Sequence, residues 1–479
     1  LKEKSIFHTL NLFRYNLSAK TFIAEGWCPD DELEKVTYAT QMATQRSGSA
    51  FPVVFKAVPT TKETPPTYFR TNKFTQAHQE IVDAYGVAQY QEINPTVFSI
   101  ITFPFLFGVM FGDVGHGIMM LLFVLFLIAR EKAFMKEGLN EMVQTCFDGR
   151  YIIVLMSLFS IYCGFMYNEC FSVPMAFNGF PASSQYDLTP GQTHMTLNDE
   201  GYRYPFGVDP AWKGAENELY YYNSLKMKMS VLMGVIQMML GIILSGLNAR
   251  FAKKPYDFWF QFVPQAVFMM SIFGYLCLLI LAKWLMTWDD VIEDTNKAVP
   301  SLLSTLVNMF LSPTSLSGDG ASEEIYGAQE GIQIFLLVIA LLCVPLMLFP
   351  KPFLLRRDHM ERKGYGHLIE EGGEEDGEGG FERFEEDHVV EEFEFQEVMI
   401  HQIIHTIEFV LGAISNTASY LRLWALSLAH SELSTVFWEK ILVGALEMHS
   451  IPSMVIGFAV WGVLNFAVLM VMESLSAFL

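Results

Sequence analysis

The sequence predicts an all-α polytopic membrane protein with about eight transmembrane helices and a small α/β segment at its N-terminus. Hydrophobic residues make up 52 % of the 479 positions and charged residues only 17 %, whereas an average soluble domain carries about 25 % charged residues. Apolar runs recur from residue 97 onward, and about 20 apolar residues in a helix cross a bilayer. The predicted spans cover residues 97–111, 114–129, 151–171, 228–248, 262–286, 332–350, 398–447 and 453–479.

Local sequence shapes two of these predictions. The first two spans form one apolar stretch that is interrupted by the glycine-rich residues 111–117. Because glycine suits tight turns, a helical hairpin is expected there. Residues 397–449 contain no proline and would reach about 80 Å as one helix at 1.5 Å per residue. That exceeds twice the hydrocarbon thickness of about 30 Å, so the seventh helix is expected to be long and tilted. The eighth helix is expected to be long and tilted as well.

Residues 1–92 have a different character and are predicted to be part of a cytosolic N-terminal α/β domain, followed by a transmembrane domain over residues 93–479. Alternating residues over 18–27 favour a strand. The acids that follow Pro29 favour the start of a helix, because the helix dipole stabilises negative charge there. Residues 74–90 have helical spacing.

The charge distribution excludes several classes of function. The formal net charge is −21, and residues 370–397 alone hold 14 acids and one base. A nucleic-acid partner is therefore not expected, since phosphates are neutralised by lysine and arginine. No Gly-Lys dipeptide exists to form a P-loop, and no cofactor is expected. The acidic loop is predicted to be a solvated linker, with a docking site for a basic partner as the alternative.

Lysine and arginine in the loops predict the orientation, because cytosolic loops carry an excess of both. The more basic set of loops, with thirteen such residues, comprises 130–150, 249–260 and 351–397. The alternate loops hold three, or five when Lys226 and Lys228 at the edge of the fourth span are counted. The N-terminus and the more basic loops are therefore predicted to be cytosolic.

The predicted seventh span carries a polar stripe. Steps of 3.6 residues place Glu408, Ser415 and Arg422 on one side of the helix, with Ser419 beside them. An arginine at the centre of a span costs on the order of 2.5–3.5 kcal/mol on insertion scales, and such residues mark ion pathways. Arg422 is therefore predicted to serve an ion pathway. The alternative is an arginine that snorkels or is paired within the helix bundle.

Other polar residues in apolar surroundings have two interpretations each. Asp113 and His116 lie in the hairpin turn and are expected to cap helix ends, with a functional role as the alternative. Lys226, like Lys228, is expected to snorkel to the membrane interface. His430 is interpreted as a proton relay or as a hydrogen-bonded core histidine.

Two further acids belong to the same set of candidates. Glu408 is interpreted as a half-channel carboxylate or as a partner of groups at the cytosolic edge. Glu473 lies in the last span, with Asn465 as a nearby polar residue there, and it is interpreted as functional.

Four motifs together resemble the a subunit of the eukaryotic vacuolar-type proton-translocating ATPase. They are residues 103–117 (FPFLFGVMFGDVGHG), 403–409 (IIHTIEF), 419–430 (SYLRLWALSLAH) and 472–477 (MESLSA). The similarity covers nearly the whole chain in order. The family's cytosolic domain is several times longer than residues 1–92, and the family's second buried arginine is expected beyond Leu479. The chain is therefore expected to be an internal piece of a longer protein.

The resemblance implies a non-catalytic stator subunit of a rotary proton pump in the membrane of an acidic organelle. Arg422 would face the proton-carrying carboxylate of the rotor. Implied partners are the proteolipid c-ring, the other membrane-sector subunits, the peripheral stalks, the soluble ATPase sector and the lipid bilayer. An autonomous secondary transporter or channel is the alternative; it predicts broken helices in matching halves of the chain, and no internal repeat is found. A pure membrane anchor would have no reason to bury Arg422.

The predicted orientation assigns sides to the proton path. The seventh span runs from cytosol to lumen, so Glu408 lies on the cytosolic side of Arg422 and His430 on the lumenal side. The eighth span runs back, which places Glu473 lumenal to the missing arginine. Protons are expected to enter past Glu408 and to leave toward Glu473 and His430.

Overall fold

The computed structural model describes residues 2–16, 21–48, 53–56, 64–135, 141–175, 186–187, 196–197, 204–286, 301–311, 326, 328–371 and 394–473. Most of the acidic loop lies outside these residues. The chain divides into two units, Leu1–Thr96 and Val97–Leu479, and each is described by itself.

The first unit combines helices with a small β-hairpin. Its elements are α1 (Lys2–Asn11), β1 (Arg14–Asn16), β2 (Thr21–Ile23), the 3₁₀ turn η1 (Asp30–Glu32), α2 (Leu33–Ser47) and α3 (Gln76–Tyr85). Strands β1 and β2 pair antiparallel with Tyr15 opposite Phe22. Small strands near the N-terminus agree with the predicted α/β character. In α3, burial lowers the pKa of His78, because an apolar environment disfavours the charged imidazole.

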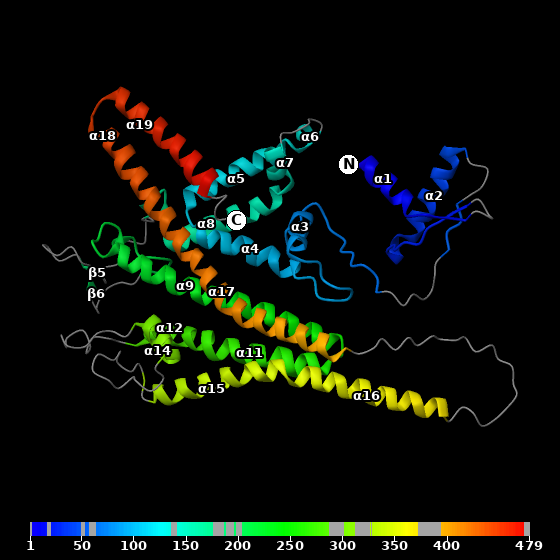
Figure 1. Ribbon diagram of the computed structural model, residues 1–479. Helices are drawn as coiled ribbons and strands as arrows, with labels where there is room; N and C mark the ends of the chain where they lie inside the picture. Colours follow the sequence, from blue (N-terminus) through cyan, green and yellow to red (C-terminus); the bar gives the residue numbers. More distant parts are fainter. Residues whose placement is uncertain are drawn as a thin grey trace. The chain divides into compact units, whose positions relative to one another are not determined.

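The second unit is built almost entirely of helices (Figure 1). Its first half comprises α4 (Thr96–Met110), α5 (Val114–Ala129), α6 (Glu131–Phe134), α7 (Glu141–Asp148), α8 (Arg150–Tyr167), the short strands β3 (Glu169–Cys170), β4 (Val173–Pro174), β5 (Tyr186–Asp187) and β6 (Thr196–Leu197), η2 (Pro210–Trp212) and α9 (Glu218–Phe251). Strand β3 pairs antiparallel with β4, and β5 with β6.

The remaining elements continue the bundle. They are α10 (Pro255–Asp257), η3 (Phe258–Phe262), α11 (Val263–Met269), η4 (Met270–Gly274), α12 (Tyr275–Leu285), α14 (Leu302–Leu311), α15 (Gln329–Leu348), α16 (Pro350–Glu371), α17 (Phe395–Val436), η5 (Phe437–Val443), α18 (Gly444–Glu447), α19 (Ile451–Leu464) and η6 (Asn465–Glu473). The segments η3, η4, η5 and η6 are π-helical turns that continue the neighbouring α-helices.

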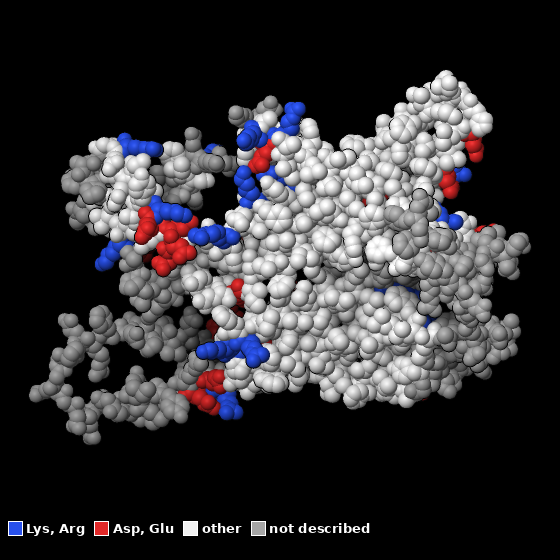
Figure 2. Space-filling model, turned by 180° about the vertical axis from the view of Figure 1, so that it is seen from behind, with Lys and Arg blue, Asp and Glu red and all other residues white. Residues whose placement is uncertain are grey.

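Among the described residues, six helices are long and apolar enough to cross a membrane. They are Arg150–Tyr167, Glu218–Phe251, Pro255–Leu285, Gln329–Glu361, Phe395–Glu447 and Ile451–Val468. They correspond to six of the eight predicted spans, and the other two predicted spans are the shorter helices α4 and α5. The face drawn in Figure 2 agrees with this: a broad uncharged surface covers the helices, and charged side chains gather toward its edges.

The predicted hairpin is present, because α4 and α5 are joined by a tight turn at residues 111–113. Helix α8 packs closely against α5. A Cβ atom on Gly164 would lie only 2.4 Å from the backbone nitrogen of Val114. The absence of a side chain at Gly164 therefore lets the backbone of α8 approach the start of α5.

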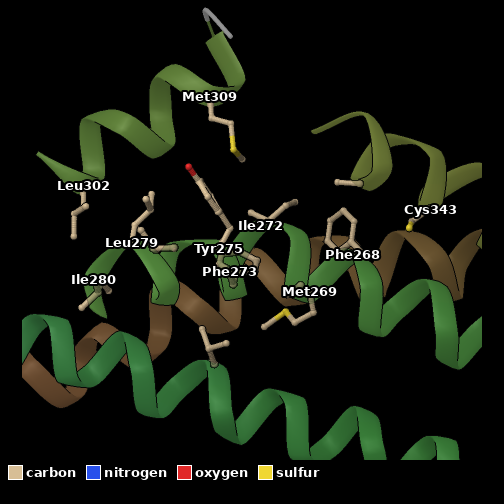
Figure 3. Close-up of a cluster of buried hydrophobic side chains, with 14 of the residues drawn as sticks. Phe268, Met269, Ile272, Phe273, Tyr275, Leu279, Ile280, Leu302, Met309 and Cys343 are labelled. Carbon is tan, nitrogen blue, oxygen red and sulfur yellow. The ribbon is translucent and has the colours of Figure 1, made fainter. Parts of the chain in front are cut away.

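Buried side chains from α9, α11, α12, α14, α15 and α17 form the main core (Figure 3). Phe268, Met269 and Tyr275 of the α11–α12 segment pack against residues of α9, α14 and α15, including Met309 and Cys343. Polar groups in this core are hydrogen-bonded: Gln333 Nε2 donates to the Tyr275 hydroxyl at 3.2 Å, which also lies 2.9 Å from the hydroxyl of Tyr326.

Helix α17 runs beside α9 and then continues through η5 into α18 without a break (Figure 1). The continuous helix covers Phe395–Glu447, which is 53 residues, so the predicted long seventh helix is confirmed. Gly234 of α9 lies against Tyr420 of α17, whose Cβ would be 2.7 Å from a Cβ at Gly234. The chain then turns at residues 448–450, and α19 leads back.

Candidate functional site

Helix α17 has an exposed face and a buried face, and both carry predicted site residues. Glu408, Ser415, Ser419 and Arg422 are all exposed. The helical spacing that placed these four residues on one side is thus reflected in their common exposure. His430 lies on the other face and is only 2 % exposed.

The exposed face around the polar stripe is otherwise apolar. Ile404, Ile407, Leu411 and Ile414 are 53–62 % exposed. Isolated exposed apolar residues are ordinary on a protein surface, but a continuous row marks contact with lipid or with another protein. This apolar row on α17 therefore requires a cover, and Arg422 is exposed two turns beyond its last member, Ile414.

Arg422 has no ion-pair partner among the described residues. Arg150 at the start of α8 offers the contrast, since its guanidinium pairs with Glu131 at 3.1 Å and donates to the Phe147 carbonyl at 2.7 Å. Apolar surroundings make an unpaired guanidinium expensive, and a partner carboxylate removes most of that cost. The pairing within the bundle that was the alternative for Arg422 is absent from the described part of the chain.

Asp113 caps α5, as the sequence predicted. Its Oδ1 atom accepts hydrogen bonds from the backbone nitrogens of Gly115 at 2.7 Å and His116 at 3.2 Å. The backbone nitrogen of Phe171 approaches both carboxylate oxygens, at 3.2 and 3.1 Å. The carboxylate thus ties the hairpin turn to the segment after α8, and it is 1 % exposed.

His116 connects three elements rather than capping a helix. Its Nδ1 atom lies 3.2 Å from Asp113 Oδ2, and its Nε2 atom lies 3.2 Å from Asn465 Oδ1. Its ring centroid is 5.0 Å from that of His430. The structure therefore brings together Asp113, His116, His430 and Asn465, all buried, from the α4–α5 hairpin, α17 and η6.

Asn465 contacts His116 and was expected to lie beside Glu473 in the last span. Its side chain points instead to the imidazole of His116 in α5. Glu473 is the last residue of η6, and its side chain lies outside the described residues.

The expectation that Lys226 snorkels to the membrane interface is wrong. Its side chain is buried at 3 % exposure, and Nζ donates to the backbone carbonyl of Ser427 at 3.3 Å. The ammonium also lies 4.9 Å from the ring centroid of Tyr167 and 5.4 Å from that of Tyr222. Burial is tolerated because a carbonyl dipole and two aromatic faces replace water around the charge. Lys228, by contrast, is only partly buried.

Glu169 is a buried acid that the sequence analysis missed. It is 5 % exposed, and its Oε1 atom accepts a hydrogen bond of 2.9 Å from Ser431 of α17. It also acts electrostatically on Lys226. The sequence feature that could have identified Glu169 is its position inside the predicted span 151–171, because an ionisable residue within a membrane span is costly.

Polar contacts also join segments that were predicted to be cytosolic. Lys351 Nζ lies 2.8 Å from Asp257 Oδ1 and donates to Gln261 Oε1 at 3.0 Å. Gln261 Nε2 in turn lies 3.1 Å from His405 Nε2. These contacts bring together the basic loop after α9, the start of α16 and the first turns of α17 at one end of the bundle. His405, which takes part in them, lies three residues before Glu408.

Comparison with known proteins decides the family. The model of the V-type ATPase 116kDa subunit family matches residues 1–479. The chain belongs to the V-type ATPase 116 kDa subunit family. It is 51 % identical over 485 residues to the vacuolar proton translocating ATPase 100 kDa subunit of Dictyostelium discoideum, covering all of this chain and 57 % of that protein.

Other members of the V-type ATPase 116 kDa subunit family are similar over the same extent. The chain is 49 % identical over 483 residues to V-type proton ATPase subunit a1 of Arabidopsis thaliana, covering 57 % of that protein. It is 45 % identical over 506 residues to V-type proton ATPase 116 kDa subunit a 1 of Mus musculus, covering 59 % of that protein. The chain thus spans a little over half the length of these relatives, and the resemblance found in its four motifs is confirmed.

Proposed function

We propose that the chain is the membrane-embedded part of a stator subunit in a rotary, ATP-driven proton pump. Its relatives are named as subunits of vacuolar or V-type proton ATPases. The chain lacks a P-loop, and its role is to conduct protons while partner subunits hydrolyse ATP. The proposed partners are the proteolipid ring, other membrane-sector subunits, peripheral stalks and the ATPase sector, in the membrane of an acidic organelle.

One observation carries this proposal: Arg422 is exposed on the same helix as a row of exposed apolar residues and has no ion-pair partner among the described residues. A lipid cover would leave the guanidinium without a counter-charge. A rotor carboxylate supplies that charge, and the small Ser415 and Ser419 on the same face let a rotor helix approach closely.

Arg422 then acts on the proton carrier. A cation within about 4–6 Å favours the ionised form of a carboxylic acid, so a rotor carboxyl group that reaches Arg422 releases its proton. The guanidinium itself does not give up a proton in proteins. It therefore blocks proton flow between the two half-channels while it discharges the rotor.

The half-channels lie on opposite sides of Arg422. Glu408 stands fourteen residues before it, close to the end where the basic segments meet, and it loads the rotor from the cytosol. His430 stands eight residues after it, within the buried group that includes Asp113, His116 and Asn465. This group, together with Glu473, forms the proposed lumenal exit.

The test uses the complete pump, purified from membranes and reconstituted in vesicles. Arg422→Lys should abolish ATP-driven acidification and leave assembly intact, because lysine keeps the charge but lacks the planar guanidinium and can lose its proton when buried. Arg250→Lys, at the end of α9, serves as the matched control and should pump normally.

The same preparation separates the proposal from its alternative. A stator co-purifies with ring-forming proteolipid subunits and an ATPase sector, whereas an autonomous transporter or channel does not. Near-normal pumping by an assembled Arg422→Lys complex would refute the assigned role of Arg422.

A further inference from the structure

We propose that Asp113, His116 and His430 form a binding site for a divalent transition metal ion, with Zn²⁺ as the preferred ion. The sequence contains no metal-binding motif at these positions, because His116 and His430 lie 314 positions apart. The site exists only where the α4–α5 hairpin packs against α17.

The three side chains have the separation that a metal site requires. Each offers one ligand atom, these atoms all lie within 4.8 Å of one another, and all three residues are buried. Bonds of 2.0–2.2 Å in a tetrahedral zinc site place ligand atoms about 3.4 Å apart. Small side-chain rotations therefore bring the three atoms to bonding distance around one ion, with a fourth position left open.

His116 is oriented as a ligand. Its Nε2 atom lies 3.2 Å from Asn465 Oδ1, and a metal-bound histidine almost always donates its second ring N–H to such an oxygen. That bond directs Nδ1 toward Asp113 Oδ2, 3.2 Å away. The Nδ1 atom is buried and makes no hydrogen bond, since the geometry of this approach does not suit one. A metal ion between the two atoms would bind both.

Asp113 is oriented in the same way. Its Oδ1 atom accepts two backbone hydrogen bonds at the start of α5. These bonds fix the carboxylate plane with Oδ2, which also accepts from the backbone nitrogen of Phe171 at 3.1 Å, directed at His116. In metal sites a ligating carboxylate is typically itself held by hydrogen bonds from neighbouring groups, as it is by the backbone N–H groups here.

The donor set selects the class of ion. Two imidazoles and one carboxylate suit Zn²⁺ and neighbouring transition metals, whereas Mg²⁺ and Ca²⁺ prefer oxygen ligands throughout. Asp113 makes no direct ion pair with a lysine or arginine among the described residues, so a cation would also help to balance its buried charge. The rings of Phe111 and Phe171, with centroids 4.4 Å from His430 and 4.9 Å from His116, shield the site.

Metal binding would have a functional consequence that rests on the proposed function. An ion held by His116 and His430 occupies the nitrogens that would accept protons in the lumenal exit. It also fastens the α4–α5 hairpin to α17. Zn²⁺ should therefore slow proton transport, while metal binding itself does not depend on that function.

The decisive experiment measures binding directly on the complete, chelator-treated complex. Co²⁺ is the spectroscopic probe, because it replaces Zn²⁺ and absorbs visible light when bound by few nitrogen and oxygen ligands. His116→Gln should bind this Co²⁺ at least about 100-fold more weakly than the unmodified complex, because loss of an outer-shell partner alone already costs about 10–100-fold. His449→Gln, in the exposed turn after α18, is the matched control and should bind as the unmodified complex does.

Asp113→Asn provides a second variant in case His116→Gln does not assemble. Asparagine is an equally good helix cap, so α5 should be preserved, but its neutral amide is a poor ligand and the same Co²⁺ should be lost. Equal Co²⁺ binding by the unmodified complex and by either assembled variant would overturn the proposal.

A transport measurement then addresses the consequence. Zn²⁺ should inhibit acidification by the unmodified complex at concentrations that fill the site. If Co²⁺ binds at the site but Zn²⁺ leaves acidification unchanged, the metal site stands and the placement of His116 and His430 in the exit path is wrong. If no Co²⁺ binds while Arg422→Lys abolishes pumping, the metal site is wrong and the proposed function stands.

Discussion

The ammonium group of Lys226 in α9 donates a hydrogen bond to the backbone carbonyl of Ser427 in α17, at 3.3 Å. The two residues are 201 positions apart in the sequence. This bond joins α9 and α17, the two longest helical elements among the described residues. It lies near the polar residues of α17 that are buried, Ser427, His430 and Ser431. Ser431, one turn further on, donates to the buried Glu169.

Replacement of Lys226 tests whether this contact stabilises the bundle. Lys226→Met keeps the length of the side chain but removes the hydrogen bond and the positive charge near Glu169. The loss of a charged hydrogen bond in a buried site should cost about 1–3 kcal/mol, seen as a lower midpoint of thermal unfolding of the purified complex. Lys228→Met, on the same helix but only partly buried, should change stability by less than about 0.5 kcal/mol. Equal stability of both variants would contradict a structural role for Lys226.

Gly234 allows a test of the close approach between α9 and α17. A methyl group at this position would meet the side chain of Tyr420 at 2.7 Å, and overpacking of this kind costs typically about 1–3 kcal/mol. Gly234→Ala should therefore reduce the thermal stability of the complex or the fraction of subunit that assembles. Gly241→Ala is the control on the same helix, because no atom lies within 4 Å of a Cβ there. It should be neutral or slightly stabilising, since alanine favours helix.

The sidedness of the proton path predicts which positions are reached from each side. Single cysteines at 408 and 473, in a background without accessible cysteines, are exposed to membrane-impermeant thiol reagents from the cytosolic or the lumenal side. Position 408 should react from the cytosol and position 473 from the lumen, as the proposed half-channels require if water fills them. Reaction of 473 only from the cytosol, or of 408 only from the lumen, would reverse the assignment.

Deletion of the acidic loop separates its two interpretations. Residues 371–387 carry a dense negative charge that repels itself and cannot bury a core. If the segment is a solvated linker, removing it should leave ATP-driven acidification and assembly close to normal. Loss of assembly in the deletion variant, measured by co-purification of the ATPase sector, would favour a docking site for a basic partner.

The sequence by itself determined the elements that depend on local patterns. Apolar runs predicted the helices because each span must satisfy its own backbone hydrogen bonds in lipid. The 3.6-residue period placed Glu408, Ser415 and Arg422 together, and their common exposure agrees with it. Asp113 was expected to cap α5 because a cap acts within its own turn, and it does so.

Only the tertiary structure decided which polar groups meet across the bundle. His116 and Asn465 are 349 residues apart, and neither periodicity nor spacing relates them. Lys226 was expected at the membrane interface because it lies at the edge of an apolar run, yet α17 covers it and supplies a carbonyl. The physical reason is the same for both. The environment of a buried polar group is set by the helix that packs against it, and that choice depends on contacts between distant segments rather than on its own sequence neighbours.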